Sequence, residues 1–288
     1  VFRESKLVVR AKREIMTNIL FVGFSVTEEK KGYVYKISEL FKNNHDVGVK
    51  QFSIGGATFE LLPYILPEFL SKNMGSTVVF EISTCYRFKN SISEYNVILN
   101  DIDEVCRKYN CSPMFVGMYR EGVDYRDDLL SLSIEYFARS RGYKYIDLIT
   151  ELLDQNTRIK YLRDGIHTTE EGALYYAEKI FREIPHDKVS RYNAWKQFDI
   201  LKLGDLAHNE EVNIFKRGGY ESTYIDINEG SEIQVSIPDQ YFVKGLIYLM
   251  GPKSGDVLVS CLDTSFNRTV HMFDERCYYS RCSYQFFP

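Results

Sequence analysis

Residues 18–25, which read NILFVGFS, decide the fold of this chain. Residues 19–22 are consecutive apolar side chains, and residues 78–80 (Val-Val-Phe) repeat the pattern. A parallel strand that is covered on both faces has this continuous apolar pattern, whereas a half-exposed strand alternates. The first strand is therefore expected inside a parallel sheet, and the polar Ser25 follows directly where that strand ends.

Short apolar runs alternate with longer helical patterns over the first two-thirds of the chain. The apolar runs lie at residues 18–24, 48–54, 77–82, 114–118 and 145–148. The helical patterns lie at residues 33–41, 59–70, 95–108, 129–141 and 168–182. This alternation predicts an α/β fold, a parallel sheet with helices on both faces.

The pattern changes after about residue 185, where helical periodicity fades. Short alternating stretches follow at residues 212–215, 223–227, 232–237, 244–250, 257–261 and 269–273. Turns that contain Gly, Asn or Pro separate them, which favours a smaller all-β domain of the antiparallel sandwich or jelly-roll kind. We therefore divide the chain into an N-terminal extension (1–15), an α/β domain (16–184) and a β-sandwich domain (199–288), with the connector at 184–198.

Bulk properties narrow the function classes. The chain has 288 residues, 44% hydrophobic and 26% charged, and a formal net charge of −4, which argues against a nucleic-acid partner. No run is long and apolar enough to span a bilayer. Residues 1–15 lack the apolar region of a secretory signal, and Met16 is a second possible start, so we expect a cytoplasmic location. Composition leaves a homo-oligomer open.

The cysteines and histidines show no metal-binding spacing, so we expect neither a metal nor an organic cofactor. The six cysteines are Cys85, Cys106, Cys111, Cys261, Cys277 and Cys282. We expect them to be free thiols. Cys277 and Cys282 flank a possible hairpin tip at 278–281, where an oxidising compartment would allow a disulfide.

Polar residues follow several of the predicted strands. Ser25 follows the first strand, Gly55 and Gly56 the second, and residues 83–86 the third. Residues 164–169, which read DGIHTT, precede the last helix. Ligands bind outside the carboxyl ends of parallel strands, so these groups are expected at one edge of the sheet.

A serine, a histidine and an aspartate in this arrangement predict nucleophilic catalysis. Serine is a weak nucleophile and needs a base within hydrogen-bond reach. His167 is the candidate base, and Asp164 is the candidate group that orients its imidazole. The backbone N–H groups of Ser25 and Gly56 are the candidate oxyanion donors, because glycine lets a backbone approach closely.

These motifs resemble those of the SGNH/GDSL hydrolases. Residues 23–25 (Gly-Phe-Ser) resemble the Gly-Asp-Ser opening block, residues 53–58 the second block, and residues 164–167 the closing Asp-x-x-His block. The resemblance covers about residues 16–182. It implies a flavodoxin-like three-layer α/β/α fold, Gly56 as an oxyanion donor, and ester hydrolysis through an acyl-serine.

The sequence departs from the family pattern at two positions. Phe24 replaces the acidic residue beside the serine, and Cys85 replaces the asparagine of the third block, which supplies an oxyanion donor. The loss of such a donor costs about 3–4 kcal/mol in a working hydrolase. Thr84, Tyr86 or Asn90 are the candidate replacements.

The residues after the third strand are also the candidate substrate-binding rim. We assign Thr84, Cys85, Tyr86 and Arg87 to it, with Cys85 as a buried thiol and Arg87 facing either an anionic substrate or solvent.

Three functions remain open. The first is an esterase for small-molecule or glycan esters, in particular an acetyl esterase on a carbohydrate. The second is an O-acyltransferase in polysaccharide biosynthesis, which uses the same acyl-serine. The third is a non-catalytic glycan-binding protein on a degenerate hydrolase fold. The tyrosines and phenylalanines of the second domain fit either sugar stacking or ordinary strand packing.

Overall fold

The computed structural model describes residues 17–42, 47–87, 89, 91–185, 200–207, 210–238, 241, 243–262, 264–275 and 277–287. The expected extension at 1–15 and nearly all of the connector at 184–198 lie outside these residues. The division of the chain into domains stays a prediction.

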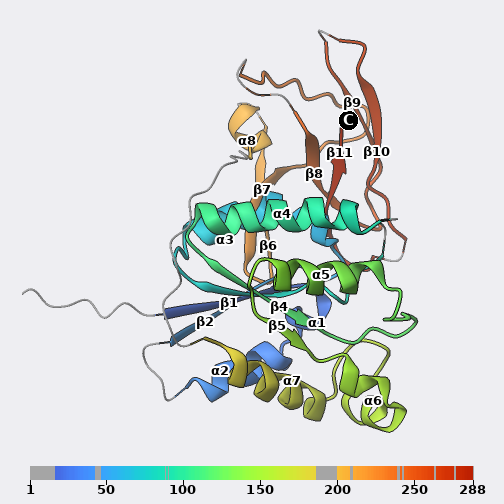
Figure 1. Cartoon of the computed structure of the whole chain (residues 1–288). Coiled ribbons are helices and arrows are strands. Elements are labelled where there is room, and N and C mark those ends of the chain that lie inside the picture. Colours follow the sequence, from blue (N-terminus) through green and yellow to red (C-terminus); the bar gives the residue numbers. More distant parts are fainter. Residues whose placement is uncertain are drawn as a thin grey trace, which may run out of the picture.

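The first part of the chain forms one parallel sheet (Figure 1). Its strands are β1 (Thr17–Gly23), β2 (Val47–Ser53), β3 (Thr77–Glu81), β4 (Ser112–Gly117) and β5 (Tyr145–Asp147). They lie in the order β2-β1-β3-β4-β5, and every neighbouring pair is parallel. This is the flavodoxin-like order, which confirms the predicted fold class. The order reverses at β1, so the crevice between the ends of β1 and β3 is the expected ligand site.

Helices cover both faces of the sheet. They are α1 (Ser25–Glu28), α2 (Tyr33–Leu40), α3 (Leu62–Ser71), α4 (Ile92–Lys108), α5 (Leu129–Ser140), α6 (Gln155–Tyr161) and α7 (Glu170–Glu183). Figure 1 shows α3, α4 and α5 on one side of the sheet and α2 and α7 on the other. The five predicted helices therefore form, while the short α1 and α6 were not predicted.

Alternate residues of the central strands feed two separate cores. Leu20 and Val22 pack with the α3–α5 side, and Ile19 and Phe21 pack with the α2 and α7 side. All four are buried. The continuous apolar pattern of β1 thus has the predicted cause, because the strand has no face toward water.

The last part of the chain is all-β apart from the short α8 (Leu203–Leu206). Its strands are β6 (Val212–Arg217), β7 (Tyr220–Ile225), β8 (Gly245–Met250), β9 (Asp256–Ser260), β10 (Asn267–His271) and β11 (Arg281–Phe286). Within the described residues they pair as three two-stranded antiparallel sheets, β6 with β7, β8 with β11 and β9 with β10. The smaller all-β part is therefore confirmed, and its arrangement as a sandwich stays a prediction.

Two local predictions in this part were wrong. Residues 232–237 alternate in exposure but form no strand, because no ladder partner pairs with them within the described residues. Residues 278–281 are not a hairpin tip, since Arg281 begins β11 and pairs with Met250 of β8. All six cysteines are free, and the Cys277 thiol donates a hydrogen bond to the carbonyl of Tyr279.

The β-rich part packs directly on the α/β part. The Gly218-Gly219 turn between β6 and β7 lies against the edge strand β2, where the Ser53 N–H donates to the Gly218 carbonyl at 2.6 Å. Tyr220 meets Phe52 edge to face and joins the core on the α3 side. The edge of the parallel sheet is thus covered by this turn.

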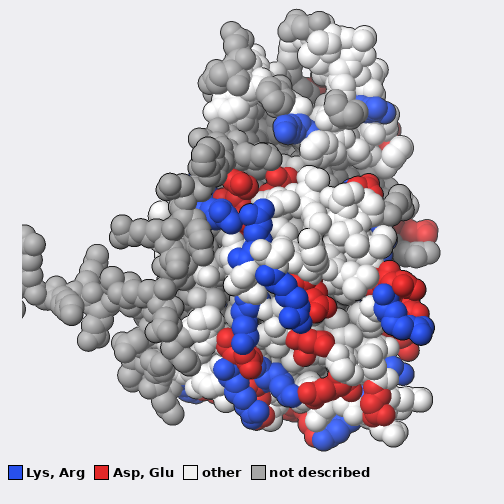
Figure 2. Space-filling view, in the orientation of Figure 1, with Lys and Arg blue, Asp and Glu red and all other residues white. Residues whose placement is uncertain are grey.

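On the face drawn in Figure 2, the helical part carries charges of both signs. Figure 2 shows Lys and Arg interspersed with Asp and Glu there, and fewer charged atoms over the β-rich part on the same face. Among the described helices, none combines the length and hydropathy needed to cross a bilayer.

The Gly218 turn gives a test of this packing. A Cβ at Gly218 would lie 1.8 Å from the Ser53 carbonyl oxygen, and its φ of 52° is left-handed. Gly230 has a φ of 75° with open space around it, so it is the matched control. We expect Gly230→Ala to lower the free energy of unfolding by about 1–2 kcal/mol and Gly218→Ala by about 2–5 kcal/mol. Denaturant unfolding measures both, and equal losses would contradict the close packing of the turn on β2.

Candidate active site

Three predicted site residues meet in one hydrogen-bonded chain. His167 Nε2 lies 3.1 Å from Ser25 Oγ, and His167 Nδ1 lies 2.9 Å from Asp164 Oδ2. The serine and the histidine are 142 residues apart in the sequence. This is the order of contacts in a nucleophile–base–acid triad: a hydroxyl, an imidazole within reach of its proton, and a carboxylate on the far nitrogen.

The turn after β1 places the nucleophile. Ser25 is the first residue of α1, and Glu28 donates its N–H to the Phe24 carbonyl at 2.8 Å. Gly23 has no room for a side chain, since a Cβ would lie 2.1 Å from Thr27 Oγ1 and 2.8 Å from the Glu81 carbonyl oxygen. A larger residue at position 23 would push the turn away from β3, so the glycine of the first motif has a packing cause.

The loop before α7 places the base. Asp164 Oδ1 accepts the backbone N–H groups of Ile166 and His167 at 2.8 and 2.7 Å, which folds the loop back on itself. Thr169 then caps α7 by accepting the Gly172 N–H at 3.0 Å. Partial burial by itself raises the pKa of Asp164, but the hydrogen bonds from His167 and Ile166 outweigh it and lower the pKa below its ordinary value. Asp164 is therefore ionised at neutral pH, as a partner for an imidazolium requires.

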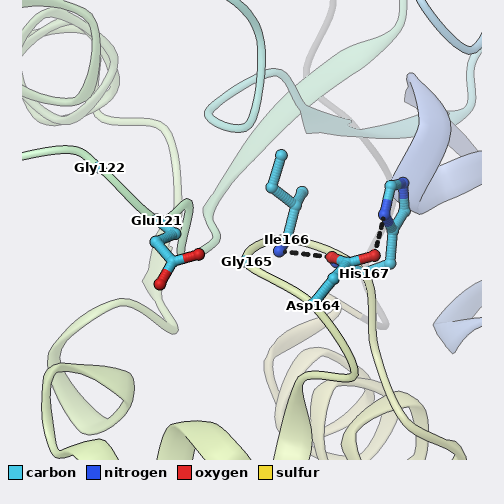
Figure 3. Close-up of a pocket in the computed structure, with 6 residues that line it drawn as sticks. All are labelled: Glu121, Gly122, Asp164, Gly165, Ile166 and His167. Atoms are coloured by element: carbon cyan, nitrogen blue, oxygen red, sulfur yellow. Dashed lines mark hydrogen bonds and ion pairs between the residues drawn. The ribbon is translucent and has the colours of Figure 1, made fainter.

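An open pocket of about 430 Å³ lies beside the Asp164–His167 pair. Figure 3 shows Glu121 on one side of it and Asp164, Ile166 and His167 on the other. The Glu121 N–H donates to the Gly165 carbonyl at 2.7 Å, which holds the loop after β4 against the catalytic loop. The Glu121 side chain is exposed, and its carboxylate has no hydrogen-bond or ion-pair partner in the described part of the chain.

The glycine loop after β2 is the second candidate source of oxyanion donors. Gly56 has a φ of 79°, a left-handed conformation that favours glycine. The Gly55 N–H is already engaged, donating to Glu28 Oε2 at 3.1 Å. The N–H groups of Ser25 and Gly56 have no acceptor among the described residues, so both remain able to bind an oxyanion.

The residues after β3 are mostly engaged with the protein itself. Thr84 is buried and donates its hydroxyl to Glu81 Oε1 at 2.9 Å. Arg87 forms a two-pronged ion pair with Asp128, at 3.0 and 2.9 Å, and Asp128 also caps α5. These contacts leave neither side chain directed at a substrate.

The two remaining rim candidates differ in exposure. Cys85 lies in the core on the α3 side, and burial together with the nearby Glu81 carboxylate raises the pKa of its thiol well above the ordinary value. It is a buried thiol, as expected, and supplies no amide in place of the asparagine. Tyr86 is 61% exposed, with the Arg120 guanidinium 4.8 Å from its ring centre. Asn90, the last candidate replacement, lies outside the described residues.

Glu81 is a buried carboxyl group next to the turn that carries Ser25, and it was not predicted from the sequence. Glu81 ends β3 and is fully buried. One oxygen accepts the N–H and hydroxyl of Thr84 at 3.2 and 2.9 Å, the other accepts the Thr27 hydroxyl at 3.3 Å, and Phe24 also donates its N–H. The Thr27 hydroxyl is in turn 2.9 Å from that of Tyr33. Glu81 thus links the turn that carries Ser25 to the end of β3. The sequence clue to this role is an ionisable residue within the apolar run VVFEI.

Of the four other histidines, His271 lies within the described residues, and it does not join this site. His271 pairs with Asp256 at 3.0 Å on the surface of the β9–β10 sheet. His45, His186 and His208 lie outside the described residues. Within the described ranges, no three metal-ligating side chains come together.

Comparison with solved structures identifies the fold. The α/β hydrolase LAE5 from the metagenome of Lake Arreo matches with a TM-score of 0.50 at 14% identity, covering 58% of this chain and 94% of its own. The acetylxylan esterase Axe2 from Geobacillus stearothermophilus matches with a TM-score of 0.47 at 16% identity, covering 60% and 97%. A member of the lipolytic protein G-D-S-L family from Veillonella parvula matches with a TM-score of 0.45 at 14% identity, covering 58% and 97%.

The α/β part shares the fold of LAE5, with the parallel strand order β2-β1-β3-β4-β5. The match with LAE5 takes in nearly the whole of that chain and a little over half of this one. No protein-family model and no curated protein matches the sequence. At these identities the likeness concerns the fold alone.

The buried Glu81 gives a pH-dependent prediction. Burial raises the pKa of Glu81 above its ordinary value of 4.5, although the hydrogen bonds from Thr84, Thr27 and Phe24 act in the opposite direction. The folded protein therefore holds this proton more tightly than the unfolded chain, and this contribution to stability is lost as the pH rises through the folded pKa. Glutamine does not titrate, so the stability of the wild type relative to Glu81→Gln should fall as the pH rises from the ordinary value of 4.5 through the raised pKa of the folded protein.

Denaturant unfolding of both proteins across this range measures the difference, with Glu229→Gln in an exposed turn as the control. A wild type that gains stability relative to Glu81→Gln as the pH rises would contradict the raised pKa of Glu81.

Proposed function

We propose that this protein is a serine acyl hydrolase that forms an acyl-enzyme on Ser25, with His167 as general base and Asp164 as the orienting acid. The observation that carries the proposal is the continuous contact from Ser25 Oγ through His167 to Asp164, at 3.1 and 2.9 Å. A degenerate binding protein has no need to keep a hydroxyl, an imidazole and an ionised carboxylate in this geometry.

The chemistry follows from the contacts. His167 Nε2 takes the proton of Ser25 as Oγ attacks the ester carbonyl, and Asp164 stabilises the imidazolium that forms. The N–H groups of Ser25 and Gly56 donate to the oxyanion. His167 then returns the proton to the leaving alcohol, which departs and leaves the acyl group on Ser25. Water, activated by the same imidazole, attacks the acyl-serine and releases the acid.

Hydrolysis is favoured over acyl transfer by the openness of the site. Transfer to an acceptor hydroxyl requires that water is kept away from the acyl-serine. Here the Asp164 side chain is 50% exposed and the adjoining pocket is open. We therefore assign water as the acceptor, and O-acyl transfer remains the alternative that a product assay with added sugar distinguishes.

For the substrate class we propose an acetyl ester on a carbohydrate. Axe2, one of the solved structures with a similar fold, is an acetylxylan esterase. In this chain Glu121 brings an unpartnered carboxylate to the pocket beside His167, where it can accept hydrogen bonds from sugar hydroxyls. Arg87 is engaged with Asp128 and is therefore not free to bind an anionic substrate.

Labelling with a fluorophosphonate probe and turnover of p-nitrophenyl acetate test the catalytic assignment. We expect the wild type to be labelled on Ser25, and Ser25→Ala or His167→Ala to lose on the order of 10⁴-fold or more in kcat/KM. His271→Ala is a matched control, because His271 also contacts an aspartate and lies far along the chain in the β9–β10 sheet. Labelling that persists in Ser25→Ala, or an unlabelled and inactive wild type, would refute the proposed hydrolase.

The role of Glu121 gives a test of the substrate class. A hydrogen bond to a charged acceptor contributes about 1 kcal/mol more than one to a neutral amide oxygen, so Glu121→Gln should raise KM for an acetylated xylooligosaccharide about fivefold. The KM for p-nitrophenyl acetate, which has no hydroxyl, should not change. Glu211→Gln, on the exposed surface, is the control. Equal effects of Glu121→Gln on the two substrates would contradict hydroxyl recognition.

A further inference from the structure

Two arginines of the β-rich part reach the glycine loop that follows β2. Arg217 ends β6 and contacts Glu28 in α1, and Arg281 begins β11 and contacts the Gly56 carbonyl. These contacts join residues 189 and 225 positions apart in the sequence. The β-rich part therefore touches the loop that carries a proposed oxyanion donor.

The Glu28 carboxylate is shared between Arg217 and the loop. Arg217 Nη2 donates to Glu28 Oε2 at 2.8 Å and Arg217 Nε donates to Oε1. The same Oε2 accepts the Gly55 N–H at 3.1 Å. Glu28 is also the last residue of α1, the short helix that Ser25 begins. One carboxylate thus connects the nucleophile turn, the glycine loop and the β-rich part.

Arg281 holds the other side of the loop. Its Nη1 donates to the Gly56 carbonyl at 3.2 Å, while Nη2 pairs with Asp274. The peptide between Gly55 and Gly56 therefore lies between two anchors, Glu28 on the Gly55 N–H and Arg281 on the Gly56 carbonyl. The N–H of this peptide is the Gly56 donor, so its direction depends on Arg281 and on Glu28, which Arg217 contacts.

The Arg217–Glu28 pair has the features of a fixed contact. The two side chains are 18% and 23% exposed, and the pair is two-pronged, unlike the mobile ion pairs of a protein surface. The Arg217 guanidinium also lies 3.8 Å from the ring centre of Tyr279, whose hydroxyl is 3.9 Å from the place a Gly56 Cβ would occupy. Its hydrogen bonds with Glu28 raise the pKa of Arg217, so it stays charged at any working pH.

We infer that Arg217 is a positioning residue of the active site, which acts through Glu28 to hold the Gly55–Gly56 peptide where the Gly56 N–H can meet the oxyanion. The β-rich part is then a component of the catalytic machinery and not an appended module. This inference rests on the proposed hydrolase function. It also explains how the site works without the amide that Cys85 replaces, because the remaining backbone donors are rigidly held.

The test compares Arg217→Ala with Lys216→Ala in steady-state hydrolysis of p-nitrophenyl acetate and in the rate of fluorophosphonate labelling. Lys216 precedes Arg217 in β6 and forms an exposed ion pair with Glu221, so it controls for the loss of one cation and one ion pair in the same strand. Removal of an aligned oxyanion donor costs 10²–10³-fold in kcat, and a misdirected donor should cost less. We expect Arg217→Ala to lower kcat and the labelling rate roughly 10- to 100-fold with little change in KM.

Two further measurements separate positioning from general stabilisation. The first measurement compares Glu28→Ala, Arg217→Ala and the double variant. The double variant should lose no more activity than the more impaired single variant, because both residues act through the same contact. Low concentrations of guanidinium should restore part of the activity of Arg217→Ala. Arg217→Lys, which keeps the charge but loses the planar fork, should be intermediate, and it carries the test if Arg217→Ala does not fold.

The outcomes distinguish the two proposals. If the wild type is labelled on Ser25 and folded Arg217→Ala matches Lys216→Ala in kcat and labelling rate, the positioning role is wrong while the hydrolase stands. Additive losses in the double variant would also overturn it. A wild type that neither reacts with the probe nor turns over ester would overturn the hydrolase and this inference together.

Discussion

The contact between Ser25 and His167 is the interaction on which the site depends, and the sheet makes it possible. Ser25 is fixed at the end of β1, which has β2 on one side and β3 on the other. His167 lies late in the sequence of the α/β part, in a loop that Asp164 stabilises by accepting the His167 N–H. The capped helix α7 follows this loop directly. The position of each residue is set by the backbone element that carries it. The 3.1 Å approach is therefore a property of the parallel sheet and its two covering layers.

Features with a local or periodic signal could be predicted from the sequence. The continuous apolar run of β1 indicated a strand buried on both faces, and the helical pattern at 168–182 indicated α7. Charges that meet across long separations had no such signal, and the Arg217–Glu28 pair is the main example. The predicted strand at 232–237 was wrong for a related reason. The alternation there corresponds to an extended segment with one half-buried side, but a β-strand also needs a pairing partner, which the segment itself does not specify.

The residues at the end of β3 shape the site from the side of the core. Cys85 turns into the core, and the space beneath the nucleophile is organised by Glu81, which accepts hydrogen bonds from Thr84, Thr27 and Phe24. Burial disfavours the ionised form of Glu81 and raises its pKa, and the hydrogen bonds from these donors offset part of the cost of burying it. Two sets of contacts thus hold the turn that carries Ser25. One is the hydrogen bonds to Glu81, and the other is the contact between Glu28 and the glycine loop.

The Gly218-Gly219 turn on β2 bears on how the α/β part behaves without its companion. Strand β2 is the outer strand of the sheet, and the turn occupies the side that β1 leaves open. A chain that ended before residue 200 would expose this backbone edge together with the apolar surface under Tyr220. Such an edge is a template for strand addition by another molecule. The β-rich part covers an edge that would otherwise pair with another copy of the chain. We therefore expect the α/β part to aggregate when it is produced without the β-rich part.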